Sequence, residues 1–370
     1  MHKLRMLGCV GVALAAVVVP TASAATVRSV SPSGHDTGSC VTSPCRTIGY
    51  ALTQASAGDT ISVAAGTYAE SVNVTKQVSL VGSNATIDAA GHDNGVVISG
   101  SSAAGTVLTG FTVENAGLEG VFVWKTSNVT VASNTVTGND AYGPFASQCF
   151  GQPDDCGEAI HLQSVANSTV TGNLVQHNVG GILLTDEDGP TFGNMISDNR
   201  VLDNTLDCGI TLASHYFSLI APAAPDVAGI YDNTVLHNES DRNGAAGIGV
   251  FTGPPGAAAY DNVVANNTAR DNGLPGVAMH SHAPFQYLNG NVVVNNTLSG
   301  NGADGDAGTV YSTGISDFSA VIPIPSTVIA GNRISDEHYG IYTVNAVKLN
   351  GLPSNKFDAA TVTVPISIHP

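Results

Sequence analysis

Charge is scarce in this sequence, and most of it carries one sign. Charged residues make up 11% of the 370 residues, and 12 Lys and Arg stand against 29 Asp and Glu. The net charge of −17 excludes long-range attraction to nucleic acid or to an anionic membrane. It also disfavours a long polyanion as substrate, unless a local basic groove overrides the overall charge. We therefore expect no nucleic-acid and no membrane partner.

Long apolar runs are missing as well, apart from one near the start. Residues 7–19 are apolar, follow Lys3 and Arg5, and precede Ala22-Ser23-Ala24. A basic start, a short apolar run and a small-residue cleavage site are typical of a secretory signal peptide. The run is too short to span a bilayer. The sequence predicts a signal peptide over residues 1–24 and a mature chain that is secreted to the extracellular space.

Cysteine is rare, and four of the cysteines fall into two close pairs. Cys40 with Cys45, and Cys149 with Cys156, are each suited to a small loop disulfide in an oxidising compartment. Metal binding is the competing interpretation, but neither pair has the two-residue spacing or nearby His of a zinc site. Cys208 precedes Gly-Ile and is expected to be a small buried apolar residue rather than a nucleophile.

Asparagine, glycine and β-branched residues are abundant and recur in a fixed phrase. Asn-x-Val or Asn-x-Ile steps begin at Asn134, Asn173, Asn199, Asn233, Asn262, Asn291 and Asn332. Companion apolar strands begin at Ile160, Ile182, Ile210, Ile248, Val277, Ile315 and Ile341. Returns roughly 22 to 41 residues apart are typical of solenoid coils with variable loops. Asn in the turns tolerates left-handed backbone and can bond its neighbours in adjacent coils.

This pattern predicts an all-β, single-domain parallel β-helix over residues 25–370, with the repeats at about 61–345. A closing strand is expected within about 346–370, and a cap within about 25–60. In the cap, Ile48, Leu52 and Ala55 recur at helical spacing after Thr47, a candidate N-cap. A short helix there would cover the open end of the solenoid. We expect the protein to be a monomer.

The opening and the repeats resemble the secreted right-handed β-helix proteins of the pectin-lyase-like superfamily, which include polysaccharide lyases. The later coils are also similar to the repeats of periplasmic copper-site accessory proteins. The resemblance covers nearly the whole mature chain and implies a right-handed parallel β-helix. It does not specify a reaction, because this scaffold carries lyases, hydrolases, epimerases and binding proteins.

The period-two rule predicts which strand residues face outward. If Ile182 and Leu184 point inward, one outward ladder holds Phe122, Trp124, His161, Gln163, Glu187, His215, Phe251, His280, His282 and Phe318. Long irregular segments adjoin the same strand ends and would wall a groove. We predict that this groove binds a polysaccharide through Trp124, Gln163, Phe251, His280 and His282. The alternative is that the aromatic residues pack loops onto the coil.

Acidic residues cluster beside this ladder. Asp186, Glu187 and Asp188 are consecutive, and Asp154, Asp155 and Glu158 lie about one coil earlier. Three interpretations stay open. The carboxylates could cleave a glycosidic bond as an acid and a base, hold Ca²⁺ with Asp154, Asp155 and Glu158 as ligands, or form a solvated turn.

His215 is the best candidate acid/base partner for these carboxylates, with Glu187 orienting it and His161 beside it. The alternative is an ordinary hydrogen-bonded surface His. His280 and His282 alternate on one side of a strand, as metal ligands do, but two His residues make a poor zinc site without a third ligand.

Several signatures of related enzymes are missing. Pectate-lyase-type elimination needs Lys or Arg near the substrate carboxylate, and the central coils hold few. The polygalacturonase series of motifs is met only loosely, by Asp186–Asp188 followed by His215. We predict a secreted carbohydrate-active protein that cleaves a polysaccharide as a glycoside hydrolase or a lyase. The alternatives are a non-catalytic glycan-binding or surface β-helix, or a copper-accessory-like factor.

Overall fold

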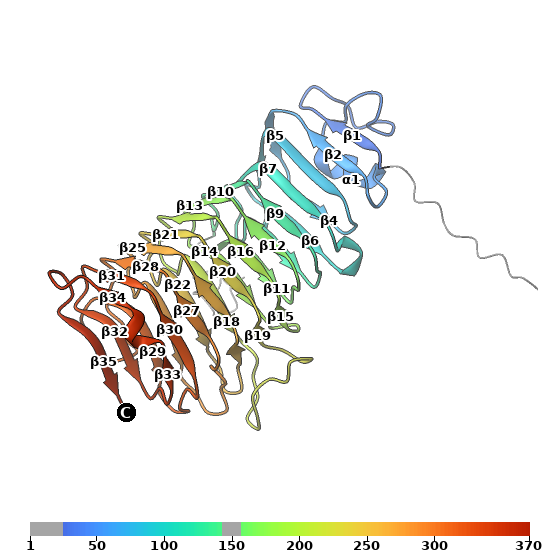
Figure 1. The fold of residues 1–370 in the computed structure, drawn as a ribbon. Helices are drawn as coiled ribbons and strands as arrows, with labels where there is room; N and C mark the ends of the chain where they lie inside the picture. The colour runs from blue at the N-terminus through green and yellow to red at the C-terminus, as the bar shows by residue number, and fades with distance from the viewer. Residues whose placement is uncertain (1–24, 143–156) are drawn as a thin grey trace, which may run out of the picture.

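The computed structural model describes residues 25–142 and 157–370, and short parallel strands stacked in coils dominate them (Figure 1). The coils run from an N-terminal end beside α1 (Ile48–Gln54) to β35 (Val364–His369) at the other end. Single 3₁₀ turns occur at Ser101–Ala103 and Leu352–Ser354. Among the described residues, no helix has the length and apolar character needed to cross a membrane. The predicted parallel β-helix is confirmed.

An eleven-stranded parallel sheet carries the predicted outward ladder. Its strands are β4 (Val72–Val74), β6 (Val96–Ser99), β8 (Val121–Trp124), β11 (Glu158–Gln163), β14 (Gly180–Thr185), β18 (Ile210–Ser214), β22 (Ile248–Thr252), β26 (Val277–Ser281), β29 (Thr313–Ser319), β32 (Tyr339–Val344) and β35. Each strand pairs with the equivalent strand of the next coil, so residues from distant parts of the chain align side by side.

A second parallel sheet of 21 strands wraps the remaining faces as two rows. The first row is β9 (Thr130–Ala132), β12 (Thr169–Thr171), β16 (Met195–Ser197), β20 (Thr234–Leu236), β24 (Val263–Ala265), β27 (Val292–Val294), β30 (Thr327–Ala330) and β33 (Leu349–Asn350). The second row is β10 (Thr135–Thr137), β13 (Leu174–Gln176), β17 (Arg200–Leu202), β21 (Glu239–Asp241), β25 (Thr268–Arg270), β28 (Thr297–Ser299), β31 (Arg333–Ser335) and β34 (Lys356–Phe357).

The two rows join at the N-terminal end, where the strands are longer. β7 (Val107–Glu114) pairs with both β9 and β10, and β5 (Ser79–Asp88) pairs with β7. The remaining strands of this sheet are β1 (Val27–Val30), β2 (Thr60–Val63) and β3 (Gly66–Ala69). A three-stranded sheet of β15 (Thr191–Phe192), β19 (Ile230–Tyr231) and β23 (Ala259–Tyr260) forms one further corner.

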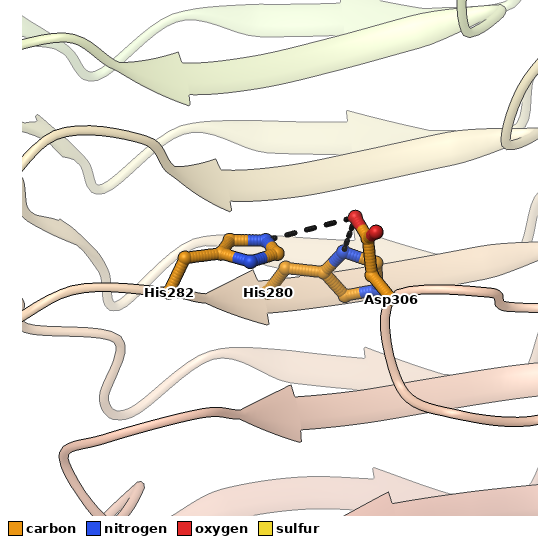
Figure 2. Close-up of side chains that lie close together, drawn as sticks. All are labelled: His280, His282 and Asp306. Atoms are coloured by element: carbon orange, nitrogen blue, oxygen red, sulfur yellow. Dashed lines mark ion pairs between the residues drawn. The ribbon is translucent and has the colours of Figure 1, made fainter.

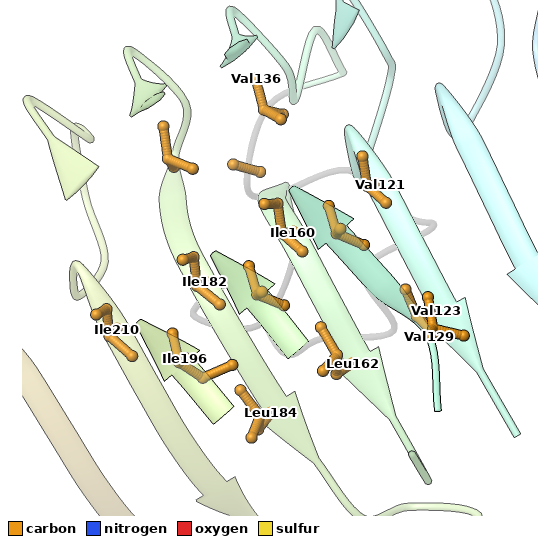
Figure 3. Close-up of a cluster of buried hydrophobic side chains, with 14 of the residues drawn as sticks. Val121, Val123, Val129, Val136, Ile160, Leu162, Ile182, Leu184, Ile196 and Ile210 are labelled. Atoms are coloured by element: carbon orange, nitrogen blue, oxygen red, sulfur yellow. The ribbon is translucent and has the colours of Figure 1, made fainter. Parts of the chain in front are cut away.

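The core is a continuous column of aliphatic side chains inside the coils. Ile160, Leu162, Ile182 and Leu184 are fully buried and point toward Ile196 and its neighbours on the facing strands (Figure 3). Each coil contributes too little apolar surface to fold alone, so the column forms only when coils stack. Because Ile182 and Leu184 face inward, the predicted register of this sheet is correct.

Buried asparagine side chains form three ladders along the turns. In each rung, an Asn carboxamide oxygen accepts from the backbone N–H, and in most rungs also from the side-chain N–H, of the residue one coil earlier. One ladder is Asn134, Asn173, Asn199, Asn238, Asn267, Asn296, Asn332 and Asn355. A second is Asn139, Asn178, Asn204, Asn243, Asn272 and Asn301, ending on Glu337. A third is Asn194, Asn233, Asn262 and Asn291.

Two details of the asparagine prediction are wrong. The seven predicted residues were treated as one series, whereas Asn233, Asn262 and Asn291 belong to a ladder at a different corner from the others. The ladder Asn residues also lack left-handed backbone. The residue just before each of them, except Asn355, adopts it, as at Asp198 with φ 55° and His237 with φ 56°. The extended Asn can then turn its carboxamide along the solenoid axis.

The N-terminal cap has the predicted helix, and Thr47 caps it by accepting from the Tyr50 N–H. Glu70 accepts from the first-turn amides of Ile48 and Gly49, where a helix has unsatisfied donors. Strand pairing already begins within the predicted cap, because β1 pairs with β2.

The predicted Cys40–Cys45 disulfide is present. Cys208 is a buried free thiol, as expected. Cys149 and Cys156 lie outside the described residues, so their pairing stays a prediction.

Candidate active site

The predicted neighbours Glu187 and His215 lie side by side just beyond the ends of β14 and β18. Ile182 and Leu184 align with Ile210 and Leu212, and continuing this register places residue 187 beside residue 215. His215 Nδ1 is 2.6 Å from Glu187 Oε1. The hydrogen bond to Glu187 therefore involves Nδ1 of the imidazole ring. The predicted adjacency is confirmed, whereas the catalytic roles stay predictions.

Glu187 is held in its charged form. Partial burial acts to raise its pKa, but the hydrogen bond to His215 and the positive charges of His215 and His161 lower the pKa to about 2. An ionised Glu187 accepts the Nδ1 proton of His215, which fixes the imidazole tautomer and its orientation. The side chain of Glu187 is 37% exposed and that of His215 is 14% exposed, so the pair lies at the surface without being fully solvated.

Asp186 has a different environment from the one predicted for a proton-transfer group. It is buried, and its carboxylate accepts from Ser214 Oγ at 2.8 Å, the His215 N–H at 2.7 Å and the Gly229 N–H at 2.6 Å. Burial raises the pKa of Asp186, and these hydrogen bonds oppose the rise. Asp186 therefore anchors the backbone of His215 from below, and it does not share the exposed position of Glu187.

Asp188 is exposed and binds two residues of the predicted substrate surface as well as Lys125. Its carboxylate accepts from Trp124 Nε1 at 2.9 Å and from Gln163 Nε2 at 3.0 Å, and it pairs with Lys125 Nζ at 3.0 Å. Hydrogen bonds from Trp124 and Lys125 lower the pKa of Asp188. The indole N–H of Trp124 and the Nε2 group of Gln163 are thus already engaged, and the indole ring offers its apolar surface. Lys125 Nζ lies 4.7 Å from the Trp124 ring centre.

His161 is buried rather than exposed, although it lies on the predicted outward ladder. Its Nε2 is 2.9 Å from Thr185 Oγ1, its Nδ1 is 3.6 Å from Glu119, and the Phe122 ring packs against it at 5.2 Å. The predicted direct proton transfer by His161 therefore lacks solvent access in this structure. Its contribution to the site is electrostatic, through the pKa of Glu187.

A pocket of about 580 Å³ opens beside His215 and extends toward the C-terminal coils. Phe251, His280 and His282 line it, as predicted for a substrate-binding groove. Gly253 occupies the register position between His215 and His282, and a Cβ there would lie 4.0 Å from the His215 ring. The absence of a side chain leaves the two imidazoles facing the same space.

Two aspartates that sequence reasoning missed complete the far end of this pocket. His280 Nε2 is 2.7 Å from Asp304 Oδ2, and both side chains are buried. His280 Nδ1 lies 3.8 Å, and His282 Nε2 3.9 Å, from Asp306 Oδ2 (Figure 2). Asp306 is therefore a candidate third ligand beside His280 and His282. The signal was Asp304-Gly305-Asp306 in the loop that leads from β28 to β29.

Of the three predicted calcium ligands, Glu158 alone lies among the described residues. Glu158 is the buried first residue of β11 rather than part of a loop, and it aligns with Gly180 of the next coil. Asp154 and Asp155 lie outside the described residues. A calcium site made of these three residues stays a prediction.

Another feature that the sequence did not reveal is an aromatic stack along the third sheet. Phe192, Tyr231 and Tyr260 stack with ring centres 5.1 Å apart, and Tyr287 meets Tyr260 edge-on at 5.4 Å. Their faces cover one another, so this stack stabilises the coils rather than offering open ring faces to a sugar.

Comparisons with known proteins agree with the fold. Residues 70–220 match the family model described as right handed beta helix region. The chain is a right-handed parallel β-helix. Residues 221–367 of the β-helix match the model described as periplasmic copper-binding protein (NosD). No curated protein matches the sequence.

Solved structures share the fold at low sequence identity. The A-module of the mannuronan C-5 epimerase AlgE4 of Azotobacter vinelandii is 14% identical, with a TM-score of 0.58 over 84% of this chain and 88% of that one. The Streptococcus pneumoniae surface adhesin PfbA is 14% identical, with a TM-score of 0.53 over 86% and 94%. An alginate lyase of a Paenibacillus species is 13% identical, with a TM-score of 0.50 over 92% and 97%. These likenesses establish the fold of this β-helix and not its reaction.

Proposed function

We propose that this β-helix is a carbohydrate-active enzyme in which His215, oriented by Glu187, removes a proton from a polysaccharide. The observation that carries the proposal is the 2.6 Å hydrogen bond between His215 Nδ1 and Glu187, with the His215 ring on the pocket wall. A carboxylate that holds one ring nitrogen prepares the other to accept a proton. Asp186 adds a rigid backbone anchor beneath the base.

The charge states of the acidic residues favour elimination over hydrolysis. A glycosidase needs one carboxylic acid that is protonated near neutral pH and a second, ionised carboxylate. Glu187, with a pKa of about 2, and Asp188, whose pKa is lowered, are both ionised, and Asp186 is buried under three hydrogen bonds. No carboxyl group of this cluster fits the acid. Elimination instead needs a base that takes C5–H of a uronate while the C4–O bond breaks, and the protonated His215 can then return that proton to the leaving oxygen, so no protonated carboxylic acid is required.

The substrate class that follows is a uronate-containing polysaccharide, bound across the coils beside β14, β18, β22 and β26. The acidic net charge opposes a polyanion at long range, and the pocket lining adds Asp207 and Asp306 to its three histidines, so binding would rely on hydrogen bonds and ring contacts rather than on positive charge. The half-buried ring of Trp124 would pack against a sugar unit on the N-terminal side of the base.

The test is a panel of uronate-containing and neutral polysaccharides incubated with the mature protein. We expect unsaturated ends, seen by absorbance, and reducing ends to appear together on an acidic polysaccharide. Reducing ends without unsaturation would indicate hydrolysis. Deuterium uptake at C5 without chain cleavage would indicate epimerisation, which shares the proton-removal step.

A non-catalytic role is the second candidate. The match of residues 221–367 to a copper-binding protein model and the likeness to a surface adhesin favour it. In that case the same panel would give binding without any product.

A further inference from the structure

We propose that His280, His282 and Asp306 bind one divalent transition-metal ion at the C-terminal end of the pocket. Each residue offers one ligand atom, and the three atoms lie within 4.8 Å of one another. The inference concerns metal binding alone, and it stands whether or not His215 removes protons from a substrate.

The separations suit a shared ion. Metal–ligand bonds of about 2.0–2.2 Å place two ligands of one ion about 3.4 Å apart in a tetrahedron and at most about 4.2 Å apart. Asp306 Oδ2 is 3.8 Å from His280 Nδ1 and 3.9 Å from His282 Nε2. Asp306 lies on a loop and its side chain is 67% exposed, so small side-chain movements can close the site around an ion.

A buried carboxylate behind the site orients one ligand. Asp304 Oδ2 accepts from His280 Nε2 at 2.7 Å, so the proton lies on Nε2 and the lone pair of Nδ1 points toward Asp306. Metal-binding imidazoles are almost always held in this way by a second group. Asp304 and Asp306 lie on the same loop. The Ala307 N–H donates to Asp304 and tightens the turn that carries Asp306.

The surroundings also hold the ring of His280 in place. Phe251 packs against it from one coil, at 5.2 Å, and Phe318 from the next, at 5.6 Å. His280 is 5% exposed while His282 is 38% exposed, so the site has a rigid inner ligand and an accessible outer one. An ion could enter from the pocket and keep a coordination position open to it.

The ligand set selects the class of ion. Imidazole nitrogen suits Zn²⁺, Cu²⁺, Ni²⁺ and Fe²⁺, whereas Ca²⁺ and Mg²⁺ prefer sites built from oxygen alone. Two imidazoles with one carboxylate resemble the three protein ligands of open zinc sites. We therefore expect Zn²⁺ and Cu²⁺ to bind and Ca²⁺ and Mg²⁺ not to compete.

The test is isothermal titration of the metal-free mature protein with Zn²⁺ and with Cu²⁺, beside the His282→Ala and Asp306→Asn variants. Both positions are accessible, so these variants should fold normally, and their melting temperatures without metal check this. We expect one ion per wild-type chain and at least about a 100-fold loss of affinity in His282→Ala. His92→Ala, an exposed histidine far from the pocket, should bind like wild type.

Electron paramagnetic resonance of the Cu²⁺ form adds a readout that a structural role would not change. Two coordinated imidazole nitrogens are expected in wild type and one in His282→Ala. The proposal is overturned if wild type binds neither ion, if both variants bind as tightly as wild type, or if Ca²⁺ displaces the bound ion.

Discussion

Three consecutive acidic residues, Asp186, Glu187 and Asp188, have three different environments at the candidate active site. Asp186 is buried and anchors the backbone of His215, Glu187 holds the His215 ring, and Asp188 binds Trp124 and Gln163 at the surface. In the sequence these three residues form one acidic run. Their different roles follow from where each residue lies just beyond the end of β14.

Replacing Asp186 by Asn should destabilise the fold. An Asn side chain replaces one carboxylate oxygen by an NH₂ group, which then faces either the His215 N–H or the donors of Ser214 and Gly229, and leaving a buried donor unsatisfied costs roughly 1–3 kcal/mol. Thermal denaturation measures the loss. Asp188→Asn is the matched control, because an exposed carboxylate in surface pairs contributes about 1 kcal/mol or less. Equal losses in the two variants would contradict the anchoring role.

The buried carboxyl group of Asp317 should give the protein an unusual pH dependence of stability. It lies in β29 between Met279 and Thr343 of the adjacent coils, at an inward position. Burial raises the pKa of Asp317 from 3.8 to about 7, with Thr327 and His280 opposing the rise only in part. A raised pKa means that the folded protein retains the proton. The stabilising contribution is present below pH 4 and is lost as the pH rises through about 7.

The substitution Asp317→Asn removes this titration and tests whether the stability of the wild type falls as the pH rises. Thermal melts at pH 4 and pH 8 should show the variant near wild type at pH 4 and more stable than wild type at pH 8, because the contribution falls between the unfolded pKa of 3.8 and the folded pKa of about 7. Glu337, whose pKa burial also raises to about 7, leaves a residual slope in the same direction. A variant that is destabilised equally at both pH values would show that the buried carboxyl group is not the cause.

At the scale of elements, the asparagine ladders bind coil to coil where the strands turn. Asn238 accepts from the backbone and side-chain N–H groups of Asn199 and donates to Ile196 O and Asn267 Oδ1. Removing its side chain leaves several buried polar groups without partners, at roughly 1–3 kcal/mol each. A ladder therefore behaves as a chain of mutually dependent bonds.

Asn238→Ala should lower the free energy of unfolding by roughly 3 kcal/mol, measured by chemical denaturation. The control is Asn73→Ala, an exposed strand residue of β4, which should change stability by about 0.5 kcal/mol or less. If the two variants unfold alike, the ladder adds little to stability.

Strand periodicity predicted much of the fold and one part of the site. The inward placement of Ile182 and Leu184 was enough to bring Glu187 beside His215, because parallel coils preserve register from one strand to the next. The position of Asp306 could not be predicted this way, since it lies on a loop whose path follows no repeat. The sequence could not separate the ladder of Asn233, Asn262 and Asn291 from the ladder of the other predicted asparagines, because both contain the same Asn-x-Val or Asn-x-Ile pattern.

At the scale of the whole molecule, the solenoid places residues from many coils along one face. The proposed base lies at the middle coils, Trp124 lies toward the N-terminal end, and the His280 cluster lies toward the C-terminal end of the same sheet. Stacked coils hold these positions rigidly, so a long chain-like ligand would contact several coils at once. A change far along the solenoid, such as Arg333→Gln on β31, should leave the proposed reaction untouched.

Release of unsaturated ends from an acidic polysaccharide, compared between wild type and the variants His215→Ala and Glu187→Gln, tests the proposed base most directly. Losing the base in His215→Ala, or the carboxylate that orients it in Glu187→Gln, should lower turnover by at least about 100-fold, while Arg333→Gln remains at the wild-type rate. His215→Ala should fold normally, as circular dichroism can verify. Full activity of His215→Ala on a substrate that wild type degrades would contradict the assignment and place the chemistry elsewhere on the solenoid.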